Sequence, residues 1–124
     1  AVFTGKKAIA FSTTPHNFSE AELRVDEIIE FIFQKKLLDY SSLYNVNIPL
    51  NSKGIKITHQ GRTHYDTRFV LENNLVYQRG KPNFDKDNEY TNSDVTAIYQ
   101  NYISITPLTV DRTDRSALEN IINK

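Results

Sequence analysis

Three histidines are the side chains of this sequence with the widest chemical use, since imidazole can bind a metal ion or move a proton near neutral pH. His59 and His64 are five residues apart, a spacing that does not place two ligands on one face of a helix. His64-Tyr65-Asp66 sets an imidazole beside a carboxylate, which can orient the ring. Because no third ligand is close in sequence, we favour surface or loop histidines over a metal site, and the same holds for His16.

The densest acidic run extends from Asp85 to Glu89 and superficially resembles a calcium-binding loop. The sixth position of such a loop needs glycine and is Tyr90 here, and the twelfth needs glutamate and is Thr96. We therefore interpret the run as a solvated, charged loop.

The glycines and serines give no signature of a phosphate-binding loop or of an activated nucleophile. The four glycines, at positions 5, 54, 61 and 80, are too far apart, and no serine stands in a G-x-S-x-G pattern. Ser12 ends a predicted parallel strand, where open α/β sheets bind ligands, but a polar residue that simply ends a strand is the favoured interpretation. The residues thus predict no catalytic and no metal-binding site in this segment, and they leave its substrate-binding residues unknown.

Composition narrows the class of protein. The chain has 124 residues, 39% apolar and 24% charged, as expected of one soluble globular domain. Fifteen basic and fifteen acidic residues cancel, so bulk charge predicts binding neither to nucleic acid nor to a membrane. No apolar run is long enough to span a bilayer. The absence of cysteine excludes disulfides and thiolate catalysis and favours the cytoplasm. Since methionine is absent too, we expect a piece of a longer polypeptide, with a native chain trimmed of its initiator as the alternative.

A strand and a helix are the first elements that would position Ser12. Residues 7–12 are almost wholly apolar, as in a strand buried on both faces of a parallel sheet. A helix over about 20–38 follows, because the apolar residues from Val25 to Ile32 are spaced to form one stripe.

The start of this helix carries two local signals. Ser19 and Glu22 have the spacing of a capping box, in which hydroxyl and carboxylate satisfy backbone donors of the first turn. Phe18 and Leu23 stand where a hydrophobic staple would join the entering chain to the helix. We therefore expect Ser19 to be the N-cap.

The downstream sequence predicts an α/β chain with an antiparallel excursion in its middle. Strands are expected at 44–49, 53–59, 67–72, 75–79 and 102–108, an exposed loop at 80–92, a short helix over 93–100 capped by Ser93 or Asp94, and a last helix capped by Thr113 or Asp114. No linker divides residues 1–124 into domains.

The segments 67–72 and 75–79 predict a β-hairpin. Asn73-Asn74 between them tolerates the positive φ that a two-residue turn demands. Apolar residues alternate along both arms, in a domain too small to cover them, so we expect these side chains to serve a subunit interface. They are Phe69, Leu71, Leu75 and Tyr77.

The order of these segments resembles the C-terminal half of the SurE family, the stationary-phase survival family of metal-dependent 5′/3′-nucleotidases. The specific strings are Asn-Val-Asn-Ile-Pro at 45–49 and Tyr-Ile-Ser-Ile-Thr-Pro-Leu at 102–108, together with Ala-Ile-Ala-Phe-Ser at 8–12 and Lys-Gly-Ile-Lys-Ile-Thr at 53–58. The resemblance covers essentially the whole chain.

This resemblance implies the C-terminal part of a Rossmann-like, three-layer α/β sheet with a projecting β-hairpin. The complete protein would hydrolyse nucleoside monophosphates with a divalent metal, Mg²⁺ or Mn²⁺. This segment would be inactive alone and bind neither ion, because the family's catalytic and metal-binding residues lie in an N-terminal half that is absent. The resemblance also implies a homodimer or tetramer built through the hairpin and the C-terminal elements. The alternative is a non-catalytic α/β oligomerisation module.

Overall fold

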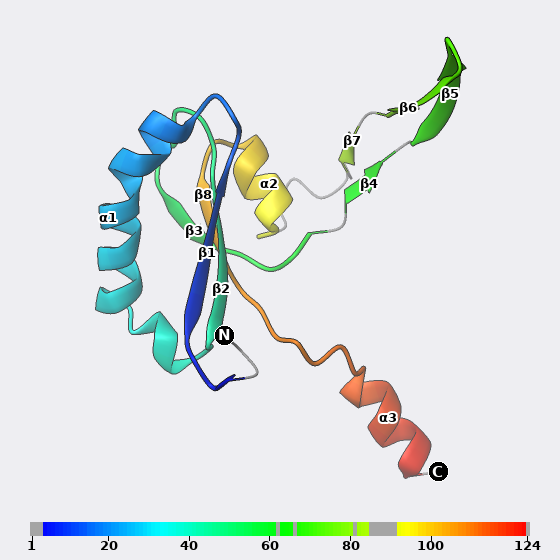
Figure 1. Cartoon of the computed structure of the whole chain (residues 1–124). Coiled ribbons are helices and arrows are strands. Elements are labelled where there is room, and N and C mark those ends of the chain that lie inside the picture. Colours follow the sequence, from blue (N-terminus) through cyan, green and yellow to red (C-terminus); the bar gives the residue numbers. More distant parts are fainter. Residues whose placement is uncertain (1–3, 62, 66, 81, 85–91, 124) are drawn as a thin grey trace.

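The chain forms a four-stranded sheet with a helix on each face, from which a hairpin and a last helix project (Figure 1). The computed structural model describes residues 4–61, 63–65, 67–80, 82–84 and 92–123. The elements, in chain order, are β1 (Ala8–Thr13), α1 (Phe18–Gln34), the short 3-10 helix η2 (Leu37–Asp39), β2 (Leu43–Ile48), β3 (Ile55–Ile57), β4 (Thr63–Tyr65), β5 (Arg68–Glu72), β6 (Leu75–Arg79), β7 (Pro82–Phe84), α2 (Asp94–Tyr99), β8 (Ile103–Pro107) and α3 (Arg115–Ile122).

The sheet has the strand order β1-β2-β8-β3 and mixed directions. β1 and β2 are parallel and are joined through α1, as a parallel pair requires a crossover. β2 and β8 are antiparallel, and β8 and β3 are parallel. The prediction of a strand buried on both faces at residues 7–12 is wrong: β1 lies at an edge of the described sheet, and Ala10, Phe11 and Ser12 are exposed.

The core lies between α1 and one face of the sheet. Alternation along β2 turns every second side chain toward α1, and the helical period of α1 turns one stripe toward the strands. The buried members of this cluster are Ala21, Ile28, Ile32, Tyr44, Val46, Ile48, Ile103 and Ile105. The hydroxyl of Tyr44 donates a hydrogen bond to the carbonyl of Leu37 at 2.5 Å, and burial raises the pKa of Tyr44.

The opposite face of the sheet is polar and is covered in part by α2, whose Ala97 is buried. Asn47 donates through Nδ2 to the hydroxyl of Ser104 at 3.1 Å. The hydroxyls of Thr58 and Thr106 are hydrogen-bonded at 2.7 Å. These bonds satisfy polar groups that burial would otherwise destabilise. With α1 on one side and α2 on the other, the three-layer α/β prediction is confirmed (Figure 1).

The start of α1 differs from the capping box predicted at Ser19. The N-cap is Asn17, whose side chain forms no capping hydrogen bond, and the helix begins at Phe18. Asn17 is buried and donates instead to Thr13 Oγ1 at 3.0 Å and to the Ile48 carbonyl at 3.4 Å. This tertiary contact draws the chain into the helix before Ser19, so the capping box is wrong.

The predicted staple and the predicted end of α1 are also corrected. Phe18 and Leu23 are both exposed and do not close over the entering chain. The helix ends at Gln34 rather than near 38, because Lys36 adopts a positive φ of 52° and the chain continues in η2.

The middle of the chain holds the hairpin and two strands that were not predicted, β4 and β7. Asn73 and Asn74 have φ of 52° and 61°, which confirms the two-residue turn. The loop predicted at 80–92 is partly wrong, since β7 pairs antiparallel with β4. The acidic run at 85–89 lies outside the described residues.

Both C-terminal helices begin at predicted caps. The hydroxyl of Ser93 accepts from the Thr96 amide, and a carboxylate oxygen of Asp114 accepts from the Ala117 amide at 2.9 Å. None of the residues of α3 is buried, and the helix lies apart from the sheet (Figure 1). Within the described parts of the chain, no helix has both the length and the apolar character needed to cross a membrane.

Candidate functional site

The carboxyl ends of β1 and β2 meet at the N-terminus of α1, and this is where an open α/β sheet binds ligands. Ser12 and Asn47 are register partners on the two strands. The Thr13 hydroxyl donates to the Ile48 carbonyl at 2.9 Å and thereby ties the two strand ends together. The predicted position of Ser12 at a strand end is therefore observed, and Asn47 lies beside it.

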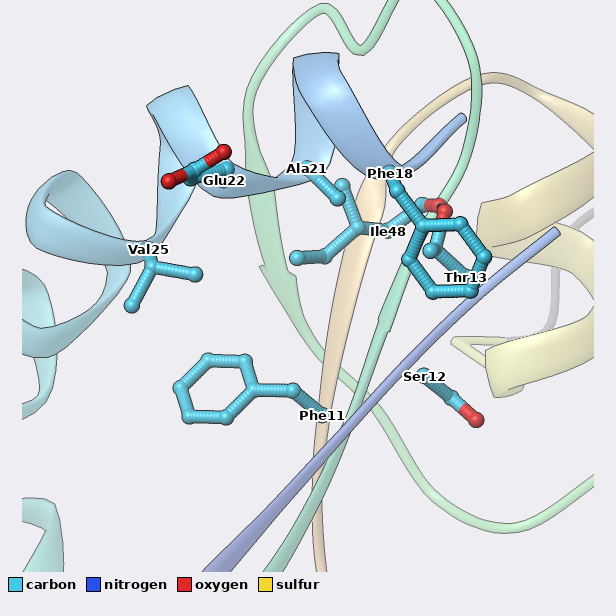
Figure 2. A pocket seen from close by; sticks show the side chains of 8 residues that line it. All are labelled: Phe11, Ser12, Thr13, Phe18, Ala21, Glu22, Val25 and Ile48. Carbon is cyan, nitrogen blue, oxygen red and sulfur yellow. The ribbon is translucent and has the colours of Figure 1, made fainter. Parts of the chain in front are cut away.

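A groove of about 370 Å³ opens beside these strand ends (Figure 2). It is lined by residues 11–13 of β1, by Ile48 of β2, and by Phe18, Ala21, Glu22 and Val25 of α1. The rings of Phe11 and Phe18 stand at two sides of it, whereas Ser12 points away from α1 (Figure 2). The groove is mostly apolar, with one carboxylate from Glu22 at its border.

The polar groups at the strand ends are neutral. Asn17 is buried, and its Oδ1 has no hydrogen-bond partner among the described residues, while its Nδ2 is satisfied. Hydroxyls and amides such as those of Ser12, Asn17 and Asn47 can orient a polar ligand but supply neither a base nor charge for a metal ion. Asn17 was not predicted as a site residue, although an asparagine directly after a strand and turn is a common N-cap residue.

The structure does not bring the histidines into one site. His16 is exposed in the turn after β1. His59 is exposed, and its Nδ1 lies 3.1 Å from the Gln60 carbonyl. His64 belongs to β4, and Asp66 lies outside the described residues. Across the described ranges, no three His, Asp or Glu side chains are grouped so as to hold a metal ion.

The hairpin of β5 and β6 is the second candidate site, for protein rather than for a small ligand. Phe69 and Leu71 are 71% and 70% exposed, and Leu75 and Tyr77 are exposed as well. In an isolated hairpin such side chains gain little from burial.

Register divides these side chains between two faces. Phe69 pairs with Gln78 and Leu71 with Val76, so Leu71 and Val76 share a face. Val70 pairs with Tyr77 and Glu72 with Leu75, which places Tyr77 and Leu75 on the other face. Val70 and Val76 were not among the predicted interface residues, and with them both faces of the hairpin are apolar.

The segment between β8 and α3 carries a carboxyl group with a shifted pKa. Hydrogen bonds from Thr113, and then one from Arg115, lower the pKa of Asp111. The Thr113 amide donates to Asp111 Oδ1 at 3.0 Å. This turn leads the chain into α3, and all of its side chains are exposed. It therefore orders a helix start and does not form a catalytic pocket.

A mixed sheet between two helix layers, with neutral polar groups at its parallel strand ends, defines an α/β protein of the open-sheet class. Residues 1–67 of this chain match the family described as "Survival protein SurE". The chain belongs to the SurE family.

Individual relatives align over nearly the whole chain. The "5'-nucleotidase SurE" of Pelotomaculum thermopropionicum is 30% identical over 97% of this chain and 49% of its own length. The "5'-nucleotidase SurE" of Pseudoalteromonas atlantica is 33% identical over 96% of this chain and 52% of its own length. The crystal structure of the SurE protein from Aquifex aeolicus has a TM-score of 0.62 and 26% identity, over 98% of this chain and 52% of that one. The chain thus spans about half the length of the curated relatives it matches.

The comparisons do not support the narrower prediction that the chain is the C-terminal half of a family member. The family match occupies the first 67 residues of this chain, and the aligned share of each relative is about half. The prediction of a C-terminal half is therefore wrong, whereas the prediction of the SurE family is confirmed.

Proposed function

We propose that this chain is part of a SurE-type 5′/3′-nucleotidase, which hydrolyses nucleoside monophosphates to nucleosides and phosphate. The observation that carries the proposal is the match of residues 1–67 to the SurE family. It is supported by relatives named 5′-nucleotidase that align over 97% and 96% of the chain.

In this proposal, the catalytic groups come from the portion of the family sequence that this chain does not span. The complete protein uses Mg²⁺ or Mn²⁺, which would supply charge stabilisation and an activated water. The described residues do not fit such an ion: a hard cation takes several convergent oxygens including carboxylates, whereas Ser12, Asn17 and Asn47 are neutral. We therefore assign no metal and no catalytic step to this segment.

In this proposal, the chain contributes part of the sheet and helps to position the nucleotide. It supplies a sheet whose parallel strand ends carry Ser12 and Asn47 beside the start of α1, where a nucleotide would be oriented. The cytoplasm is the compartment that suits a chain without cysteine.

A homodimer or tetramer is the assembly that this proposal includes. Its interface is the hairpin, with Phe69, Leu71, Leu75 and Tyr77. The exposure of these side chains in the described chain supports an interface between protein chains. The same observation favours the second candidate function, a non-catalytic α/β oligomerisation module.

Phosphate release from AMP tests the proposal. We expect the 124-residue chain alone to release none with Mg²⁺ or Mn²⁺. Joined to the portion of the Pelotomaculum thermopropionicum protein outside the alignment, in the order the alignment gives, it should release phosphate, and EDTA should abolish this release.

Two results would contradict the proposal. A joined protein that is folded and oligomeric but releases no phosphate would favour the interaction module. Metal-dependent release by the 124-residue chain alone, lost in His59→Ala, His64→Ala or Asp66→Asn, would reveal a local site.

A further inference from the structure

Strands β4, β5, β6 and β7 form an arm that leaves the sheet after β3 and returns to it at α2 (Figure 1). The hairpin of β5 and β6 lies at the far end of this arm (Figure 1). The base of the arm consists of residues 58–61 on the way out and 92–95 on the way back. Its first residue is still bonded to the sheet, because the Thr58 amide donates to the Ile105 carbonyl at 2.9 Å. The direction of the arm relative to the sheet is therefore set at this base.

Backbone hydrogen bonds join the two segments of the base to each other. The His59 amide donates to the Asn92 carbonyl at 2.9 Å, and the Asp94 amide donates to the His59 carbonyl at 2.9 Å. His59 and Ser93 thereby form an isolated parallel bridge. The outgoing and returning segments thus hold each other before the chain enters the arm.

The Asp94 side chain adds a second link across the base. Its Oδ1 accepts from the Gly61 amide at 2.7 Å and from the Val95 amide at 2.8 Å. Because the N-cap of α2 is Ser93, the Asp94 carboxylate is not needed to cap the helix. Hydrogen bonds to a charged acceptor are stronger than those between neutral groups. The carboxylate therefore ties the outgoing segment to the first turn of α2.

Gly61 lies so close to α2 that a side chain would not fit. A Cβ at this position would lie 2.9 Å from Val95 Cγ2, 3.0 Å from Asp94 Oδ1 and 3.1 Å from Ser93 Cβ. Ser93 is buried and caps α2, so it cannot move aside without loss of the cap. Overpacking of this kind forces the backbone apart. Any larger residue at position 61 should therefore open the base of the arm.

We propose that Gly61 and Asp94 form a clasp that holds β4 and β7 in place relative to the sheet and thereby presents the hairpin to another copy of the chain. Both are positioning residues, since neither belongs to the hairpin. An arm that is already ordered loses less conformational entropy when it associates. The role in association rests on the proposed function, whereas the clasp itself rests on the geometry of the base.

Backbone ¹⁵N order parameters of the 124-residue chain test the clasp. In the unmodified chain, the amides of Thr63–Tyr65 in β4 should match those of β8, at about 0.85, and in Gly61→Ala they should fall below about 0.6. The values in β8 should stay unchanged. Gly54→Ala is the matched control, because a Cβ at position 54 would meet the Tyr102 ring at an ordinary distance of 3.8 Å.

A pair of variants at Asp94 separates the hydrogen bond from the packing at Gly61. Asp94→Ala removes the acceptor and should loosen β4 as Gly61→Ala does. Asp94→Asn keeps an oxygen that can accept from the Gly61 amide and should retain the order of β4. This pair also tests the clasp if Gly61→Ala does not fold.

Sedimentation of the same variants tests the role of the clasp in association. The dissociation constant of the assembly should rise at least about 10-fold in Gly61→Ala and Asp94→Ala, through the added cost of ordering the arm. It should not change in Gly54→Ala or Asp94→Asn.

The outcomes distinguish the clasp from the proposed function, because none of them depends on phosphate release. Order parameters of β4 that are low in the unmodified chain, or that do not fall in Gly61→Ala and Asp94→Ala, would overturn the clasp. A loosened arm with an unchanged dissociation constant would overturn its role in association. A chain whose arm loosens as expected but which does not associate would support the clasp and contradict the proposed assembly.

Discussion

Strands β2 and β5 have similar apolar content and opposite environments. Val46 in β2 is fully buried, because β1 and β8 flank the strand and α1 covers one face. Leu71 in β5 is exposed, because the strand has β6 as its pairing partner and neither helix layer reaches it (Figure 1). Apolar residues in a strand therefore predict a need for burial, while the surrounding elements decide whether the chain itself meets that need.

The largest expected effect of a substitution lies in the core. Ile28→Ala should lower the free energy of unfolding by about 2–5 kcal/mol through a cavity under the sheet. Ile29→Ala should cost less, since Ile29 is half-buried, although the sequence pattern placed it in the same stripe. Denaturant unfolding at a concentration where the chain is monomeric provides the measurement. Leu71→Ala is the matched control and should leave the free energy of unfolding of the monomer nearly unchanged. Equal losses of stability in Ile28→Ala and Leu71→Ala would contradict the contrast between core and hairpin.

Deleting the hairpin tests the other half of the comparison. Removal of residues 67–78, closed with a short turn, should lower the oligomer mass in light scattering and leave the melting temperature nearly unchanged. The reason is that this surface contributes to association and little to the core. An unchanged mass with a strongly reduced melting temperature would make the hairpin part of the core instead.

Two serines test, with smaller expected effects on stability, whether a side chain caps a helix or lies inside it. Ser93→Ala should destabilise the chain by about 1 kcal/mol, because the Ser93 hydroxyl accepts a hydrogen bond from the Thr96 amide and alanine offers no acceptor in its place. Ser19→Ala should cost much less, since Ser19 lies inside α1 and does not cap it. The two variants differ by one hydroxyl each and are compared by denaturant unfolding. A larger loss for Ser19→Ala would restore the capping box.

The smallest effect is expected at the exposed start of α3. The pKa of Asp111 is lowered in the folded chain, chiefly by the Thr113 hydrogen bonds. A carboxyl of this kind stabilises the fold above its ordinary pKa, and the contribution is lost as the pH falls through the lowered value. NMR shifts of the Thr113 amide should report loosening of this turn in acid. Asp111→Asn should show no such transition, and a transition that persists in it would assign the change elsewhere.

Local chemistry in the sequence predicted several features correctly. Asn73-Asn74 dictates a two-residue turn through its tolerance of positive φ, and Ser93 and Asp114 cap the helices that follow them. Tertiary contacts explain the failures. Asn17 bonds to Thr13 and to the β2 end instead of capping α1, and Pro82 enters a strand because β4 lies beside it. Neither partner is visible in a local pattern.

The candidate site was less predictable than the fold. Ser12 was placed at a strand end from pattern alone, but its neighbour Asn47 is identified only by the register of β1 with β2. The exposure of β1 was missed, because an apolar strand is typical of a sheet interior and the sequence does not show which neighbours are present.

Hydrogen exchange of the 124-residue chain at two concentrations tests most directly the contrast between sheet and hairpin. The amides from Ile103 to Thr106 in β8 should exchange slowly at both concentrations, because the chain alone buries them. The amides of Phe69 and Val76 should exchange fast when the chain is monomeric and slow when it associates. Protection of the hairpin equal to that of β8 in the monomer would contradict the account, since the hairpin would then be stabilised within one chain.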